Sequence, residues 1–276
     1  MIDSIKIGNR TFDLVGHTYV MGILNVTPDS FSDGGRWNDM EHAMAHVESM
    51  IAEGADIIDI GGESTRPGHK EISCDEEIAR VTPYIEAVKR QFDIPVSIDS
   101  YKSAVVSAAI DSGADLVNDI WGLKYDDTLA RIIAHSGLPC CLMHNRHDST
   151  HYGDFVEDVL DDLRESVDIA VNAGIDREKI ILDPGVGFGK DTEQNLIITN
   201  NMERLMELDL PVLLGTSRKS MIGNTLGLPV DERVEGTIAT SVMAAMKGIS
   251  FVRVHDVRAN KRAIDMTLAI MNSGRK

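Results

Sequence analysis

The sequence contains little cysteine: three residues, Cys74, Cys140 and Cys141, in a chain of 276. An odd count with two adjacent members in an apolar run does not fit a disulfide framework, so we expect a reduced, intracellular protein. A metal site would need further ligands at a recognisable spacing, and the sequence offers none around these positions. Burial as small side chains is therefore the expected role of the cysteines.

Two further absences limit where the protein is expected to be located and what it is expected to bind. No apolar run reaches about 18 residues, which argues against a membrane span, and the N-terminus lacks the basic-then-apolar pattern of a signal peptide. Lysine and arginine number 27 against 44 aspartates and glutamates, a formal charge of −17. General nucleic-acid binding needs a basic face, whereas a local basic cluster is enough to bind a small anion. We expect a cytoplasmic protein with small-molecule partners, no nucleic acid and no membrane.

Short apolar runs rich in Ile, Val and Leu recur along the chain, and each is followed by a helical pattern. The runs are YVMGILNVT, ADIIDIGGEST, IPVSIDS, ADLVNDIWG, LPCCLMHNR, KIILDPGVGFGK, LPVLLGTSRKS and ISFVRVHDV. Continuous apolarity indicates strands buried on both faces, hence parallel strands. About eight strand–helix units close a (β/α)₈ barrel, so the sequence predicts an α/β TIM barrel formed by a single domain, 1–276. The opening segment is expected to form a short hairpin over the bottom of this barrel, with Gly8 and Asn9 at its turn.

An open doubly wound sheet shares this alternation and is the structural competitor. Its site occupies one crevice at a switch point, whereas here nearly every expected strand ends in polar side chains. In chain order these are Asn25, Asp59 with Glu63, Asp99, Asn118 with Asp119, His144, Asp183, Ser217 with Lys219, and Arg253 with His255. A barrel brings all strand ends to one rim and is the better fit.

One expected function of that rim is anion binding. Arg253 and His255 are two residues apart, so on a strand they share a face and offer several donors to one anion. Arg66 adds a second cation on the loop after the second strand. The structural alternative for a lone Arg or His is a pair with a neighbouring carboxylate.

The other expected function is to bind a planar heterocycle. Asp99, Asn118 and Asp183 offer acceptors to ring N–H and NH₂ groups, and Lys219 offers a donor to a ring oxygen or nitrogen. Charged groups buried at strand ends are costly unless they meet such partners. The alternative for each single Asp is a helix cap, for which Asp99 is well placed.

The connection after the first strand, Thr27 to about Asn38, is unusually long. We interpret it as a lid hinged by Gly34 and Gly35 and stiffened by Pro28; a structural loop without catalytic movement is the alternative. A second long connection covers residues 62 to about 73.

Two familiar catalytic or binding motifs are absent from the sequence. DPGVGFGK looks like a phosphate loop, but it lacks the G-x-x-x-x-G-K-[ST] spacing and Asp191 follows its Lys. No Ser–His–Asp order or nucleophile elbow is present in the sequence.

The segments GILNVTPDSFSDGG and DIGGESTRPG resemble the two signature segments of the dihydropteroate synthase family. SIDSYK, NDIWG, LMHNR, DPGVGFGK, GTSRKS and RVHDV follow in that family's order, so the resemblance covers most of the chain. It implies that 4-aminobenzoate is joined to 6-hydroxymethyl-7,8-dihydropterin pyrophosphate, with Mg²⁺ assisting, to give 7,8-dihydropteroate and pyrophosphate for folate synthesis. It also implies competition by sulfonamides and a homodimer.

The same resemblance implies roles for individual residues. The pterin is expected against Asp99, Asn118, Met143, Asp183, Phe188, Gly215 and Lys219. The pyrophosphate is expected against Asn25, Arg66, Arg253 and His255, with Asn25 also at the metal. The aminobenzoate site is expected to be bordered by Phe31, Thr65, Pro67, Ser217 and Arg218. Asp33, Lys219, Arg253 and His255 are the expected catalytic residues, with Asp33 stabilising a transient cation.

The implied reaction needs no enzyme nucleophile, because pyrophosphate can leave before attack through a ring-stabilised cation. It needs stabilisation of the leaving group and exclusion of water. Two rivals remain at this stage. A methyltetrahydrofolate:corrinoid methyltransferase-like barrel would have little need for Arg66, Arg253 and His255, and a non-catalytic pterin-binding module would have no use for pyrophosphate ligands.

Overall fold

The structure, a computed structural model, describes residues 2–27, 36–64, 71–146 and 152–274. Its main sheet has eight parallel strands in the order β8-β7-β6-β5-β4-β3-β10-β9. They are β3 (Tyr19–Asn25), β4 (Ile57–Gly61), β5 (Val96–Asp99), β6 (Leu116–Asp119), β7 (Cys140–Met143), β8 (Ile180–Asp183), β9 (Leu213–Leu214) and β10 (Phe251–Val254). A bridge between Leu182 of β8 and Val212, just before β9, joins the two edges. The predicted barrel is confirmed.

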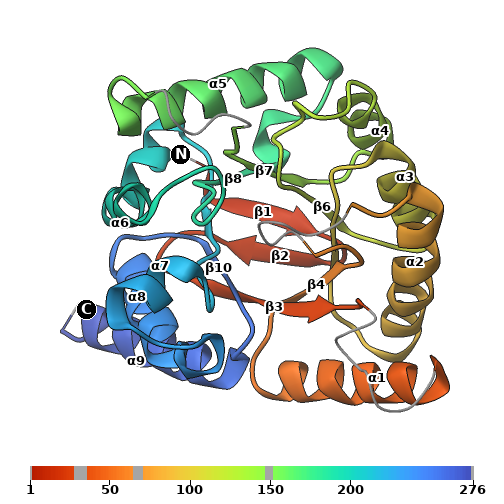
Figure 1. Cartoon of the computed structure of the whole chain (residues 1–276), viewed down its shortest axis with the longest axis horizontal. Coiled ribbons are helices and arrows are strands. Elements are labelled where there is room, and N and C mark those ends of the chain that lie inside the picture. Colours follow the sequence, from red (N-terminus) through yellow and green to blue (C-terminus); the bar gives the residue numbers. More distant parts are fainter. Residues whose placement is uncertain (1, 28–35, 65–70, 147–151, 275–276) are drawn as a thin grey trace.

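Helices surround this sheet (Figure 1). They are α1 (Arg36–Ala52), α2 (Cys74–Gln91), α3 (Ser103–Asp111), α4 (Leu129–Ser136), α5 (Phe155–Ala173), α6 (Thr192–Asn200), α7 (Ser220–Leu226), α8 (Val234–Met246) and α9 (Val257–Asn272), with short 3₁₀ turns η2 (Arg177–Lys179), η3 (Met202–Leu208) and η4 (Val230–Glu232). The first long connection is slightly shorter than expected because α1 already begins at Arg36. Among the described residues, no helix has the length and apolarity needed to cross a membrane.

The N-terminal hairpin closes one end of the barrel, as the sequence predicted. Strands β1 (Ser4–Ile7) and β2 (Arg10–Asp13) pair antiparallel, and Gly8 in the turn has a φ of +60°, which favours glycine. Ile5, Ile7 and Phe12 pack against an inward-facing layer formed by Met21, Ile57, Leu116, Cys141, Ile181, Leu213 and Phe251. This apolar layer seals the barrel at the amino ends of its strands.

The period of two along a strand places polar side chains directly above the apolar layer, since residues i and i+2 face the same way. The inward-facing pairs are Ile57 and Asp59, Leu116 and Asn118, Cys141 and Met143, Ile181 and Asp183, and Phe251 and Arg253. The intervening residues, such as Ile58, Leu182 and Val252, pack in the core between the sheet and the helices. The strands therefore have a polar interior at their carboxyl ends.

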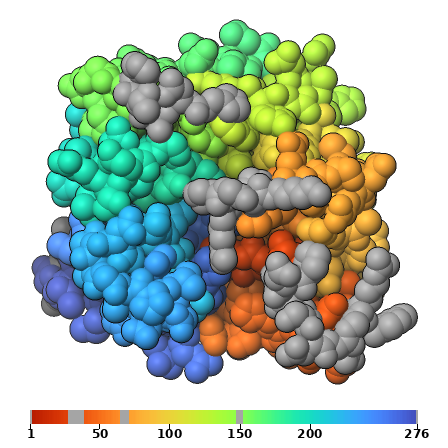
Figure 2. All heavy atoms as spheres, in the orientation of Figure 1, coloured from red at the N-terminus to blue at the C-terminus, as the bar shows by residue number. Residues whose placement is uncertain are grey.

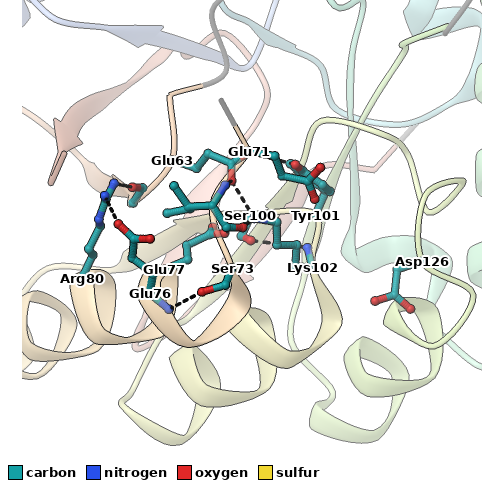
Figure 3. A network of polar contacts seen from close by, with 12 residues as sticks. Glu63, Glu71, Ser73, Glu76, Glu77, Arg80, Ser100, Tyr101, Lys102 and Asp126 are labelled. Carbon is teal, nitrogen blue, oxygen red and sulfur yellow. Dashed lines mark hydrogen bonds and ion pairs between the residues drawn. The ribbon is translucent and has the colours of Figure 1, made fainter. Parts of the chain in front are cut away.

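A buried ion cluster ties together the segments that follow β4 and β5 (Figure 3). Lys102 Nζ lies 2.6 Å from Glu63 Oε2 and 2.9 Å from Glu77 Oε2. The same ammonium donates to Ile72 O at 2.7 Å, and Tyr101 Oη donates to Glu63 Oε1 at 2.8 Å. Burial disfavours the charge of Glu63, but the hydrogen bonds outweigh it and leave the pKa of Glu63 below its ordinary value. The cluster therefore anchors both ends of the connection between β4 and α2, at Glu63 and at Ile72.

Loss of the ammonium should destabilise the fold. Lys102→Met leaves Glu63 and Glu77 buried without a counter-charge, so we expect the free energy of unfolding to fall by about 3–5 kcal/mol. Lys247→Met is the matched control, because Lys247 pairs at 2.6 Å with the partly exposed Glu203; it should cost about 0–1 kcal/mol. Urea unfolding followed by circular dichroism measures both, and equal costs would contradict a structural role for the cluster.

Candidate active site

A guanidinium between two carboxylates lies in the polar interior of the barrel. Arg253 Nε donates to Asp59 Oδ2 at 2.6 Å, and Arg253 Nη2 donates to Asp99 Oδ2 at 2.6 Å. Asn118 Nδ2 adds a longer bond of 3.4 Å to Asp59 Oδ2. Both carboxylates are buried, and the opposite charge offsets the cost of removing them from water. Arg253 therefore adopts the carboxylate pairing that the sequence left open as an alternative.

The other oxygen of each carboxylate is an unused acceptor. Asp59 Oδ1 and Asp99 Oδ1 are buried and have no hydrogen-bond partner within the described residues. Burial raises the pKa of Asp99 to about 7, although Arg253 opposes the shift. Because an unpaired buried acceptor is costly, these two oxygens are places where a ligand N–H gains a hydrogen bond.

Asp183 and Lys219 flank a glycine on the adjoining part of the rim. A Cβ on Gly215 would lie 3.5 Å from Asp183 Oδ2 and 3.7 Å from Lys219 Nζ, so the carboxylate and the ammonium border the space that a side chain would fill. Asp183 Oδ1 accepts from Gly185 N at 2.7 Å, and Lys219 Nζ donates to Val186 O. Burial lowers the pKa of Lys219 to about 8, against the attraction of Asp183.

An apolar cluster lies beside these polar groups. Tyr101, Ile120 and Met143 form it, with Trp121 and Phe188 packed against them. Met143 is paired with Asp183 across β7 and β8, and Lys219 Nζ lies 4.7 Å from the centre of the Phe188 ring. Apolar surface next to convergent donors and acceptors suits a flat ring with a polar edge.

A second hydrogen-bonded group lies where β10 ends. Ser217 Oγ is 3.0 Å from His255 Nδ1 and accepts from His255 N at 3.1 Å. Arg218 makes a bidentate pair with Asp256, with bonds of 2.9 and 2.6 Å. Arg253 and His255 thus both reach the rim, but their bonds go to different partners.

Asn25, the last residue of β3, stands close to Asp99. A Cβ on Gly61 would lie 3.8 Å from Asn25 Oδ1 and 3.5 Å from Asp99 Oδ2, so both oxygens face the same glycine. In the described ranges, no cluster of three or more His, Cys, Asp or Glu side chains is arranged to hold a metal ion.

Several expected site residues lie outside the described part of the chain. Residues 28–35 include Pro28, Phe31, Asp33, Gly34 and Gly35, and residues 65–70 include Thr65, Arg66 and Pro67. The expectations for these residues, the lid included, stay predictions.

Two residues in or next to the site have no role that the sequence predicts. Asp59 was noted at a strand end, and the signal that would have singled it out is the need of Arg253 for a counter-charge on a facing strand. Lys190 was noted within DPGVGFGK; its bonds to its own loop depend on backbone geometry that the pattern does not contain.

Comparison with known proteins identifies the family of the chain. The family described as "Pterin binding enzyme" matches residues 21–255. The chain is 59% identical to the dihydropteroate synthase of Clostridium beijerinckii, over 95% of this chain and 98% of that protein. It is 51% identical to the Bacillus subtilis enzyme of the same name, over 93% and 90%.

Solved structures give the same result. The dihydropteroate synthase of Xanthomonas albilineans with 4-aminobenzoic acid has a TM-score of 0.93 at 41% identity, covering 98% of this chain and 99% of that one. A Yersinia pestis dihydropteroate synthase with a sulfonamide drug complex has a TM-score of 0.91 at 41% identity, covering 98% and 100%. The chain belongs to the dihydropteroate synthase family of pterin-binding enzymes.

Proposed function

We propose that this protein joins 4-aminobenzoate to 6-hydroxymethyl-7,8-dihydropterin pyrophosphate and releases 7,8-dihydropteroate and pyrophosphate. The observation that carries the proposal is the pair of unpartnered buried acceptors, Asp59 Oδ1 and Asp99 Oδ1, beside Asp183 and Lys219. The N–H and NH₂ groups of a pterin match the carboxylates and Asn118, and a ring oxygen or nitrogen matches the ammonium. The apolar cluster with Met143 and Phe188 receives the face of the ring.

The pyrophosphate group is assigned to the rim. Arg253 uses Nε and Nη2 on its carboxylate partners, which leaves Nη1 as a donor, and His255 and Asn25 stand at neighbouring strand ends. Arg66 is assigned here by the family resemblance. Together these donors act where negative charge develops as pyrophosphate leaves.

The residues present also fit Mg²⁺. This ion prefers oxygen ligands and commonly takes one or two from the protein and the rest from substrate phosphates and water. Asn25 Oδ1, facing the same glycine as Asp99, offers one such oxygen at the rim. When bound, Mg²⁺ stabilises the charge of the leaving group.

The chain supplies positioning and electrostatic stabilisation in this reaction, and no nucleophile. Asp99, Asp183 and Lys219 hold the pterin so that its CH₂–O bond lies at the mouth, and the basic groups stabilise the departing pyrophosphate. Asp33 is assigned to the transient cation by the family resemblance alone.

The aminobenzoate is assigned to Ser217 and Arg218 and, by the family resemblance alone, to Phe31, Thr65 and Pro67. Arg218 is held in place by its bidentate pair with Asp256. Related structures contain 4-aminobenzoic acid or a sulfonamide, and we extend both ligands to this chain.

The two rival functions are less well supported. A corrinoid methyltransferase would not use Arg253 and His255 for pyrophosphate, and relatives of 44–59% identity are named dihydropteroate synthases. A pterin-binding module without activity would have no need for the basic rim.

We also propose a homodimer. Most of the large apolar side chains that are exposed in the described residues belong to α6 to α9 and η4. They are Leu196, Ile197, Leu226, Val230, Met246, Met266 and Ile270. The helices α6 to α9 lie on one side of the molecule (Figure 1). Such a concentration favours a covered surface. Sedimentation equilibrium tests it, and a monomer at micromolar concentration would contradict it.

The proposed location is the cytoplasm. Cys74, Cys140 and Cys141 are all free. The predicted burial is confirmed for Cys140 and Cys141, whereas Cys74, at the start of α2, is only partly buried. Unpaired thiols are typical of a reducing compartment.

Turnover tests the function directly. Purified protein should form dihydropteroate from the pterin pyrophosphate and 4-aminobenzoate when Mg²⁺ is present, and a sulfonamide should suppress it. Asp183→Asn should lower kcat/KM for the pterin substrate by roughly 100-fold, since a charged hydrogen bond is lost. Tight pterin binding with no pyrophosphate release under any condition would contradict the proposal.

The activity should also fall at alkaline pH. Lys219 faces Asp183, Asp99 and Arg253, and burial lowers its pKa to about 8. The ammonium is present below that pKa and is lost as the pH rises through it, so kcat/KM for the pterin substrate should fall about tenfold per pH unit above about 8. Lys219→Arg stays charged and should lack this decrease. A flat profile from pH 7 to 10 in the wild type would contradict the role of Lys219.

A further inference from the structure

Lys190, the last residue of DPGVGFGK, directs its ammonium back onto its own loop. Lys190 Nζ donates to Gly185 O at 3.0 Å, to Phe188 O at 3.1 Å and to His144 Nδ1 at 2.8 Å. Burial lowers the pKa of Lys190 to about 7; in the charged form the ammonium has three N–H donors, and each has an acceptor in the chain. No donor of Lys190 is left for a phosphate or a pterin, which separates it from the lysine of a phosphate loop.

His144 is held in the form that accepts this bond. Its Nε2 lies 2.9 Å from Asp162 Oδ2, and Arg146 Nε donates to the same oxygen. Burial lowers the pKa of His144 to about 4, so the ring is neutral. With Nδ1 accepting from Lys190, the ring proton is on Nε2 and is donated to Asp162.

The loop of residues 184–189 contains glycines that pack directly against the backbone of neighbouring residues, so its own side chains supply few anchors. A Cβ on Gly185, at φ +69°, would lie 1.9 Å from His144 O, and one on Gly189, at φ +53°, would lie 2.9 Å from Arg146 O. Asn195 of α6 supplies one anchor by accepting from Gly187 N at 2.6 Å. Lys190 supplies two more, on Gly185 and Phe188.

The same loop also contacts Lys219 and fixes the position of its side chain. Val186 O accepts from Lys219 Nζ, and the Phe188 ring lies 4.7 Å from that nitrogen. A Cβ on Gly187 would lie 2.9 Å from Lys219 Cδ, so the backbone packs directly on the lysine stem. Any shift of this loop therefore moves the ammonium assigned to the pterin.

We propose that Lys190 is a positioning residue for pterin binding: it holds the 184–189 loop so that Val186 O and the Phe188 ring fix Lys219 Nζ against the pterin. This inference rests on the proposed function. It extends that function to a residue outside the pocket, whose three bonds all go to the protein.

The test compares Lys190→Met with Lys179→Met. Lys179, at the opposite end of β8, also donates to a backbone carbonyl, Gly137 O at 2.8 Å. Isothermal calorimetry measures binding of the pterin pyrophosphate, and steady-state kinetics gives kcat and both KM values. Lys190→Met should weaken pterin binding and raise the pterin KM about tenfold or more, since small misplacements in a site are costly. The aminobenzoate KM should change less than about twofold, and Lys179→Met should match the wild type.

The outcomes distinguish failure of the Lys190 proposal from failure of the proposed function. If the wild type does not bind the pterin pyrophosphate, the proposed function fails. If the wild type binds it and folded Lys190→Met binds equally well, the inference alone is wrong. Lys190→Gln is the second variant, in case the Met variant shows no cooperative melting. Weaker pterin binding by the folded Gln protein supports the inference, whereas unchanged binding, or failure of both variants to fold, overturns it in favour of a general role in stability.

Discussion

The bridge from Arg253 to Asp59 and Asp99 is the interaction on which the interior of this barrel depends. The two carboxylates come from neighbouring strands, β4 and β5, whose register places Gly61 beside Asp99. Arg253 reaches them from β10, across β3. Two buried carboxylates on neighbouring strands would repel each other, and burial would favour their neutral forms. The guanidinium between them opposes both effects. Their unused oxygens are then available to a ligand.

This arrangement follows from a change of residue type along each strand. Inward-facing residues near the amino ends are mostly apolar and pack on the hairpin, with Ser97 of β5 as an exception, while those two positions later are mostly polar. One end of the barrel is consequently closed by apolar side chains, and the other carries charged and polar groups. Figure 2 shows the molecule in the orientation of Figure 1, with the residues whose placement is uncertain in grey. A reaction that needs stabilisation of a leaving group and exclusion of water suits polar groups held in this way above an apolar layer.

Local patterns in the sequence were sufficient for the barrel, the hairpin and most strand ends, because apolar runs and turn residues act over short distances. The partner of Arg253 was not decided, since a pair that spans several strands depends on register and side-chain direction. The bonds of Lys190 cannot be predicted from the sequence, for a different reason. They require the left-handed backbone of Gly185, Gly187 and Gly189, which folds the loop over its own lysine.

The most direct test of the carboxylate bridge is the affinity of Arg253→Gln for 6-hydroxymethyl-7,8-dihydropterin, the pterin alcohol that carries no pyrophosphate. If Arg253 maintains the carboxylates that receive the pterin, calorimetry on the folded variant should show binding weakened about tenfold or more relative to the wild type, since a buried charge pair has been broken. An unchanged affinity for this ligand would mean that Arg253 serves pyrophosphate alone, and that the barrel interior does not depend on its bridge to Asp59 and Asp99.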